Sequence, residues 1–258
     1  MDKNLIKVSK DSVENLTLYN VRQKRVWGLI AKDLQQYSNL PIDWDTITLQ
    51  ELKKFIPLDK LNCHYNCIVD LSFSDKAHRR RAVDEIFEMA SAVIVQKETD
   101  SMYEKFTLFQ GVTYEKGAST CCLQMGLNGL RWMLNFSKNF TLFPIESFLK
   151  LSTAYSQELF LLLSEFYKTG KLCISIEKFK ERMGCPESYD MGNIKQRILI
   201  PTLNEFNRIP EVKISFQCHM YSKEEKGSHF GRKKLNMLNF TILTKGEDEL
   251  FYNKIDEQ

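Results

Sequence analysis

Residues 153–216 carry the clearest structural signal in the chain. They read TAYSQELFLLLSEFYKTGKLCISIEKFKERMGCPESYDMGNIKQRILIPTLNEFNRIPEVKISF. Apolar residues recur there first at helical spacing and finally in strict alternation. We expect helices at about 145–167, 176–183 and 190–207, and strands at 171–175, 212–217 and 235–243. Gly170 and Gly184 follow the first two helices as turn residues. Helices followed by a hairpin are typical of a winged-helix domain.

The first half of the chain repeats this order. We expect helices at about 16–37, 48–56 and 75–91, and extended segments at 63–73, 92–96, 104–115 and 119–125 with a turn at Gly117. Ser74 or Asp75 can cap the third helix, whose predicted buried stripe is Val83, Ile86, Phe87 and Ala90. The sequence therefore predicts an α+β chain of two tandem winged-helix domains, 1–143 and 144–258, joined near 137–146.

Composition restricts the class of protein. The chain has 258 residues, 43% of them hydrophobic, and only 11 Gly and 6 Pro, which excludes collagen-like and broadly disordered chains. No apolar run reaches the roughly 20 residues of a membrane span, and the N-terminus has no apolar core of signal-peptide length. Seven cysteines are an odd number. They indicate reduced thiols, so we expect a cytoplasmic protein.

Motifs for catalysis and metal binding are weak. No P-loop is present, and the four histidines form no His-x-His pair. The metal-like cluster Cys63-His64-x-x-Cys67 lacks further ligands, so we interpret both cysteines as half-buried on one face of a strand. Cys121 and Cys122 are adjacent and should point to opposite sides of a strand. We expect no catalytic residue, no metal and no cofactor, and hypothesise that the chain is not an enzyme.

The predicted helix 190–207 has a polar face. At about 100° per residue, Asp190, Asn193, Arg197 and Asn204 share one sector, while Leu199, Leu203 and Phe206 form the opposite, core-facing stripe. Arg pairs bidentately with guanine and Asn with adenine in the major groove. Lys195 and Gln196 lie beside the sector, within reach of phosphate, and Pro201 should kink the helix. The alternative is an ordinary solvated helix face.

Two basic clusters favour binding to nucleic acid. The predicted loop 221–234 should act as a wing that contacts phosphate, with a solubilising hairpin tip as the alternative; its cations are Lys223, Lys226, Arg232, Lys233 and Lys234, against Glu224 and Glu225. The second cluster crowds the start of the helix 75–91, where the helix dipole disfavours cations unless an anion is near. DNA phosphate is one such anion, and a solvated basic turn is the alternative; the residues are Lys76, His78, Arg79, Arg80 and Arg81.

The chain resembles the Rep-3 superfamily, the initiators of iteron-controlled bacterial plasmids. The resemblance rests on Tyr155-Ser156 before Leu159-Phe160, the helix 176–184, Tyr189, Lys195-x-Arg197-Ile198-Leu199-x-Pro201 and Glu205-Phe206-Asn207. The first half is similar through LIKVSKDSVENLTLYNVRQKRVWGLI (5–30) and FTLFQGVTYEKG (106–117). Glu158 departs from the family, which often has Arg at that place.

The resemblance implies function and partners. It implies two winged-helix domains, of which the second is the principal sequence-specific binder of double-stranded DNA and the first adds DNA contacts and dimerises. It implies a monomer that binds origin repeats (iterons) and recruits the host replication initiator and helicase. It further implies a dimer that represses its own gene at an operator.

Other classes of protein remain to be weighed. A tandem winged-helix transcriptional repressor would share the fold. A rolling-circle nicking enzyme would need the missing His-x-His site, and the basic clusters argue against a winged-helix adaptor that binds only protein.

Overall fold

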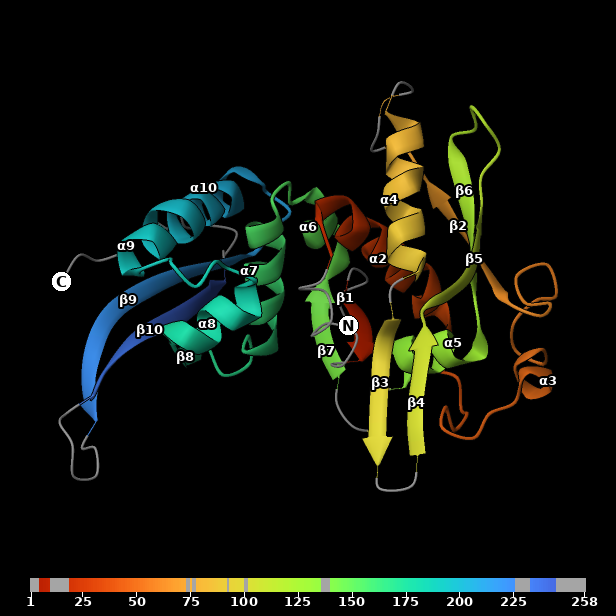
Figure 1. Cartoon of the computed structure of the whole chain (residues 1–258), viewed down its shortest axis with the longest axis horizontal. Coiled ribbons are helices and arrows are strands. Elements are labelled where there is room, and N and C mark those ends of the chain that lie inside the picture. Colours follow the sequence, from red (N-terminus) through yellow and green to blue (C-terminus); the bar gives the residue numbers. More distant parts are fainter. Residues whose placement is uncertain are drawn as a thin grey trace. The chain divides into compact units, whose positions relative to one another are not determined.

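A computed structural model describes residues 5–9, 19–72, 75, 78–91, 93–99, 102–135, 140–225 and 233–244. The chain divides into two compact units, Leu5–Thr141 and the part from Leu142 onward (Figure 1). Both units combine helices with antiparallel strands, and the predicted α+β class is confirmed. Within the described residues, no helix is both long and apolar enough to cross a membrane.

The N-terminal unit is built around a three-stranded antiparallel sheet of order β2-β6-β5. Along the chain, the β3-β4 hairpin lies between α4 and β5. Strand β1 pairs with β7 (Phe140–Pro144). The elements are β1 (Leu5–Ser9), α2 (Val21–Leu34), η2 (Gln35–Tyr37), α3 (Leu49–Leu52), β2 (Tyr65–Asp70), α4 (Arg79–Ser91), β3 (Val93–Thr99), β4 (Met102–Thr107), β5 (Phe109–Thr113), β6 (Thr120–Met125) and α5 (Leu127–Leu134).

Local signals explain several boundaries in this unit. Asn20 caps α2 by accepting a hydrogen bond from the Gln23 N–H, and the Gln23 side chain bonds back to the N–H of Asn20. The predicted helix 16–37 therefore begins later, at Val21; residues 16–18 lie outside the described part. Gly117 occupies the predicted turn with φ +88°, a conformation that favours glycine.

The third helix of the N-terminal unit differs from the prediction in two ways. α4 begins at Arg79, and Asp75 caps the turn before it by accepting from the His78 N–H at 3.0 Å; Ser74 is outside the described residues. Val83, Ile86 and Ala90 are buried as predicted, but Phe87 is 44% exposed. The buried stripe includes Met89 instead, because Phe87 lies about 100° around the helix from the centre of the stripe.

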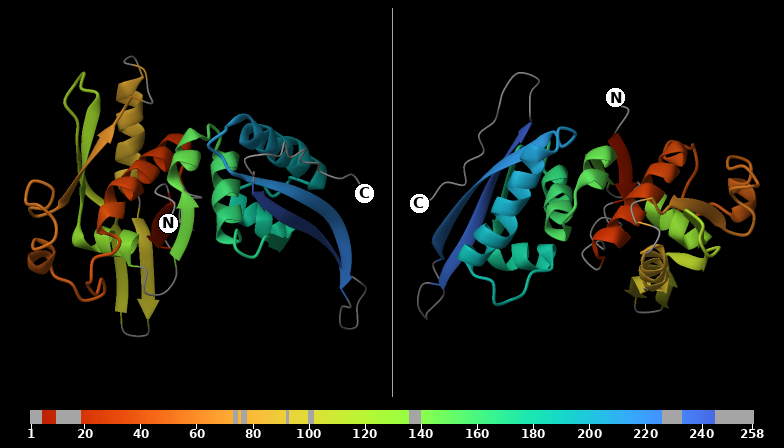
Figure 2. Two further views of the ribbon diagram at one scale, coloured as in Figure 1. Left: turned by 180° about the vertical axis from the view of Figure 1, so that it is seen from behind. Right: turned by 90° about the horizontal axis from the view of Figure 1, so that it is seen from above.

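The C-terminal unit has the element order of a winged helix: helix, strand, helix, helix, then a two-stranded hairpin. Its sheet order is β8-β10-β9, and the helices gather on one face of it (Figure 2). The elements are α6 (Ile145–Lys150), α7 (Ala154–Glu165), β8 (Lys171–Ser175), α8 (Ile176–Met183), α9 (Met191–Ile194), the π-helical segment η3 (Lys195–Leu199), α10 (Ile200–Arg208), β9 (Ile214–Glu225) and β10 (Lys233–Thr244).

A continuous chain of aromatic rings forms the core of this unit. Neighbouring rings have centroids 5.7–6.4 Å apart, within the range in which aromatic pairs stabilise a core beyond the area that they bury. The chain ties α7 to α10, α10 to the sheet and the sheet to α8. It consists of seven fully buried residues: Phe143, Phe148, Phe160, Phe206, Phe216, Phe240 and Phe179.

Most predicted elements of the C-terminal unit are confirmed. β8 and α8 have the predicted bounds, and Gly184 ends α8 in the left-handed conformation with φ 60°. The predicted helix 145–167 is instead two helices, because Leu151 is extended and Thr153 caps α7. The predicted loop 221–234 is wrong at both ends, since β9 continues to Glu225 and β10 begins at Lys233.

The cysteines match the predictions in part. Cys121 is buried and Cys122 is half-buried, as expected for opposite sides of β6. Cys67 is buried in β2, but Cys63 is exposed and precedes the strand, so the two cysteines share no strand face.

Candidate nucleic-acid interface

The predicted recognition helix is the run α9–η3–α10, which begins at a side-chain cap. Asp190 precedes α9 and accepts hydrogen bonds from the backbone N–H of Asn193 at 2.7 Å and from its side-chain Nδ2 at 3.0 Å. The bond from the Asn193 N–H is the main cause of a pKa for Asp190 below its ordinary value. Asp190 was predicted on the polar face. It caps the helix, and it also holds the Asn193 amide in the free protein.

A π-helical segment precedes Pro201 in this run. The N–H of Ile200 donates to the carbonyl of Lys195, five residues earlier, and Pro201 stands in the first turn of α10, where its missing N–H is tolerated. A π turn holds more residues than an α turn. A helical wheel drawn at about 100° per residue therefore misplaces Asn204 relative to Arg197.

The predicted probe residues all lie on this run. Gln196, Arg197 and Asn204 are exposed, whereas Asn193 and Lys195 are half-buried. The opposite stripe is confirmed, since Leu199, Leu203 and Phe206 are buried. The helix therefore exposes the side-chain amides of Gln196 and Asn204 and the guanidinium of Arg197 to solvent. Amide and guanidinium groups are those that read base edges in the major groove.

Glu205 joins this helix to the start of α7. The residue is only 6% exposed, and its carboxylate accepts from the N–H and the hydroxyl of Ser152, at 2.7 and 2.5 Å. Burial opposes ionisation of Glu205, but hydrogen bonds from Ser152 and Ser156 outweigh it and hold the pKa below its ordinary value. Charge-assisted bonds of this kind fix α10 against α7.

Arg182 joins α8 to α7 through two carboxylates. Its Nη2 lies 2.7 Å from Glu165 Oε1, and its Nη1 lies 3.3 Å from Glu158 Oε1. The side chain of Glu158 is 1% exposed and that of Arg182 is 15% exposed, so this is a buried ionic network. Glu158, the departure from the family pattern, thus has a structural partner within the unit.

Arg197 makes a contact that the wheel did not predict. Its guanidinium carbon lies 5.4 Å from the centroid of the Tyr189 ring, the geometry of a cation–π interaction. Its Nη1 also donates to the Tyr189 hydroxyl at 3.5 Å. Tyr189 was singled out only through the resemblance; its place directly before the capping Asp190 was the signal that could have revealed it.

The wing is the long β9–β10 hairpin. Its register places Lys233 opposite Glu225 and Lys234 opposite Glu224, with Lys223 opposite Leu235. In this register Glu224 and Glu225 are the cross-strand neighbours of Lys234 and Lys233. Lys226 and Arg232, at the predicted tip, lie outside the described residues.

The basic cluster of the N-terminal unit has acidic partners in its own chain. The His78 ring nitrogen Nδ1 lies 2.8 Å from Asp75, Arg80 lies 3.1 Å from Asp84, and Arg81 lies 3.4 Å from Glu85. His78, Arg80 and Arg81 are exposed, and Arg79 is half-buried. His78, Arg80 and Arg81 thus each have a carboxylate of the same chain beside them. Lys76 lies outside the described residues.

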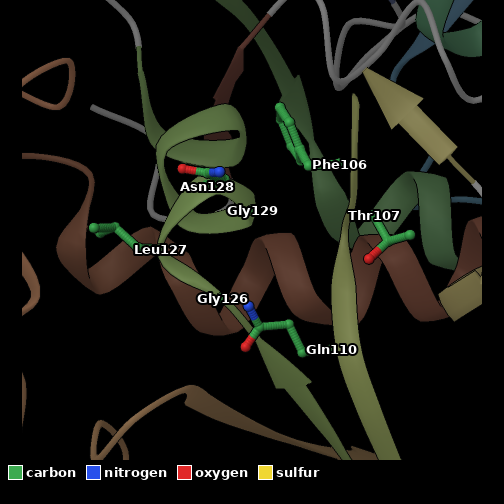
Figure 3. A pocket seen from close by; sticks show the side chains of 7 residues that line it. All are labelled: Phe106, Thr107, Gln110, Gly126, Leu127, Asn128 and Gly129. Atoms are coloured by element: carbon green, nitrogen blue, oxygen red, sulfur yellow. The ribbon is translucent and has the colours of Figure 1, made fainter. Parts of the chain in front are cut away.

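A separate cavity of about 420 Å³ lies within the N-terminal unit. In Figure 3 the strand that carries Phe106 and Thr107 lies on one side of the cavity, and the first turn of α5 lies on the other side. None of its lining residues ionises, so the cavity itself offers no acid or base; they are Phe106, Thr107, Gln110, Gly126, Leu127, Asn128 and Gly129. Among the described residues, no group of three or more His, Cys, Asp or Glu could hold a metal ion.

Each unit combines helices with a three-stranded antiparallel sheet, and the C-terminal one exposes a polar face on its third helix. This arrangement defines the class of tandem winged-helix proteins. The chain belongs, more closely, to the family of replication initiator Rep proteins. Residues 4–164 match the family model described as "Initiator Replication protein, WH1", and residues 175–242 match "Initiator Rep protein, WH2". The resemblance to the Rep-3 superfamily and the tandem winged-helix prediction are confirmed.

A solved structure has a similar fold. It is described as "Crystal structure of Pi initiator protein in complex with iteron DNA". The match has a TM-score of 0.61 at 16% sequence identity, and covers 96% of this chain and 100% of that chain. A comparison with curated proteins found no significant match.

Proposed function

We propose that this chain initiates plasmid replication by binding double-stranded DNA at repeated origin sites, the iterons. One observation carries the proposal: in a chain of the Rep initiator family, the third helix of the C-terminal winged helix exposes Gln196, Arg197 and Asn204. Arginine and amide side chains on such a helix suit guanine and adenine in the major groove. The similar fold of an initiator solved with iteron DNA supports the choice of repeats as the site.

The two domains have different tasks in this proposal. The domain 144–258 reads sequence through the recognition helix and contacts phosphate through Lys195 and the wing. The domain 1–143 adds phosphate contacts through its basic cluster and forms the interface of a dimer. The monomer binds iterons, and the dimer represses its own gene at an operator.

The proposal extends to partners and place. The monomer, bound near an AT-rich region, recruits the host replication initiator and helicase in the bacterial cytoplasm. The chain does no covalent chemistry and needs no cofactor. The free energy for its action at the origin comes from binding DNA.

Two linked measurements test the proposal. First, duplexes enriched by the protein from a random library are compared with scrambled duplexes of the same composition by fluorescence anisotropy. We expect at least about 1,000-fold tighter binding to the enriched duplex, as for specific DNA-binding proteins. Second, a plasmid that carries the gene and its flanking DNA as its only origin should replicate. Specific binding without replication would favour the transcriptional repressor, and equal affinity for both duplexes would refute sequence-specific binding.

A further inference from the structure

The side chain of Arg197 is exposed but is held in one place. Its guanidinium lies over the ring of Tyr189 and donates a hydrogen bond to the Tyr189 hydroxyl. A free arginine side chain at a surface has many rotamers, and ordering it on binding opposes association. Stacking on an aromatic ring removes part of that freedom before DNA arrives.

Tyr189 has contacts of its own within the C-terminal unit. Its backbone N–H donates to Pro186 O at 3.1 Å, which closes the turn before the helix. Its side chain lies near that of Tyr155, in the first turn of α7. Burial is the main cause of the raised pKa of Tyr155, followed by its neighbours Cys185 and Tyr189, so these groups are packed together. Arg197 thus contacts a tyrosine that lies near the first turn of α7.

The contact with Tyr189 leaves Arg197 competent to read a base. A cation–π contact uses the flat face of the guanidinium, whereas bidentate recognition of guanine uses N–H groups at its edge. The hydrogen bond to the Tyr189 hydroxyl, at 3.5 Å, is at the long limit for such a bond and is easily exchanged for a base acceptor. The tyrosine therefore supports the probe without occupying the whole of its donor edge.

We propose that Tyr189 is a positioning residue that presents Arg197 to the DNA. The inference rests on the proposed function, because it takes Arg197 to contact the DNA. It adds a residue outside the recognition helix to the set that determines affinity and specificity.

A double-mutant cycle with Tyr189→Leu and Arg197→Ala tests this inference, with affinity measured for the enriched duplex described above. Arg197→Ala should weaken binding by about fivefold to 150-fold. Tyr189→Leu should weaken binding by about two- to fivefold when Arg197 is present, the usual size of an exposed cation–π contact. It should cause no further loss when Arg197 is absent, and Tyr189→Phe, which keeps the ring, should bind almost as the parent does.

The control variant is Tyr167→Leu. Tyr167 is an exposed tyrosine just past the C-terminal end of α7, and the helix extends about 15 Å from Tyr155 to its last residue, Glu165. The Tyr167→Leu variant should bind DNA as the parent does. Circular dichroism melts verify that the Leu variants are folded. If Tyr189→Leu does not fold, the DNA affinity of Tyr189→Phe is used in its place. ¹⁵N relaxation of the Arg197 Nε–Hε group in the free protein should show an ordered side chain in the parent and in Tyr189→Phe.

The outcomes separate this inference from the proposed function. Independent, multiplicative losses in the cycle would mean that Tyr189 acts on its own and would overturn the inference while leaving the proposed function in place. A mobile Arg197 in the free parent protein, or a Tyr189→Phe variant as weak as Arg197→Ala, would also overturn it. No loss of binding on Arg197→Ala would refute the role of Arg197 in the proposed function, and the inference with it.

Discussion

The buried network of Arg182 should be the most sensitive polar feature of the C-terminal unit. Arg182 on α8 neutralises Glu158 and Glu165 on α7, and the side chains of all three are at most 15% exposed. Arg182→Met keeps most of the aliphatic stem but leaves two buried carboxylates without their cation. Breaking a buried pair in this way costs about 3–5 kcal/mol. We therefore expect the unfolding free energy of this unit to fall by about that amount.

The chain offers a way to assign the loss to one unit. Its three tryptophans, Trp27, Trp44 and Trp132, all lie in the N-terminal unit. In urea unfolding, tryptophan fluorescence therefore reports on the N-terminal unit, while far-ultraviolet circular dichroism reports on both. Arg182→Met should shift the circular dichroism transition to lower urea and leave the fluorescence midpoint in place. The matched control Lys178→Met, at an exposed site on the same helix, should change stability by less than about 0.5 kcal/mol.

A rescue variant completes the argument. Adding Glu158→Gln and Glu165→Gln to Arg182→Met removes the uncompensated charges and should recover part of the lost stability. A loss below about 1 kcal/mol for Arg182→Met, comparable to that of Lys178→Met, would refute the view that this network holds α8 to α7.

Three further predictions concern the clamp and the basic clusters. Glu205→Gln should make stability depend less on pH in the acid range. The folded pKa of Glu205 lies below its ordinary value of 4.5, so the carboxylate stabilises the parent above that pH. This stabilisation is lost as pH falls through the folded pKa, as urea titrations between about pH 6 and 3 would show. Lys233→Ala and Lys234→Ala should each lower the salt slope of DNA binding by roughly one unit on enriched and scrambled duplexes alike, and an unchanged slope would leave these lysines in solvent. Replacing the arginine cluster with alanine should weaken binding of the monomer to one iteron more than binding of the dimer to an operator, and equal losses in footprints of both would contradict it; the residues are Arg79, Arg80 and Arg81.

Much of the fold follows from local pattern. Ile176, Phe179 and Met183 are buried as their spacing predicts, and Gly117, Gly170 and Gly184 all have positive φ in the predicted turns. The alternating strands 212–217 and 235–243 place Phe216 and Phe240 in the core. These features depend on neighbours in sequence, which is why periodicity and turn chemistry reveal them.

Some failures come from local caps that the pattern of apolar residues does not show, and others from pairing between segments. At the break between α6 and α7, Thr153 caps α7, and Glu205 accepts from the N–H of Ser152 across 53 residues. Strand pairing with Glu225 and Glu224 extends the hairpin to Lys233 through a segment whose charges suggested a loop. Periodicity carries no information about such contacts.

The candidate site was predictable in its location but less so in its geometry. The pattern identified the helix and its exposed Arg197, but it assigned Asp190 to the probe face rather than to the cap. The π-helical segment is set by the hydrogen bond from Ile200 to Lys195, which a wheel of fixed angle does not represent. The contact between Tyr189 and Arg197 joins a loop to a helix, and a helical wheel does not represent it either.

If the helix α9–η3–α10 reads base sequence, the loss of Arg197 must change the base preference of the protein. Base preferences are determined for the parent and for Arg197→Ala by sequencing the duplexes that each enriches from the same random library. We expect the variant to lose discrimination of about 1–3 kcal/mol at one base pair and to keep the preferences elsewhere. Identical preferences at every position, with unchanged affinity, would contradict it.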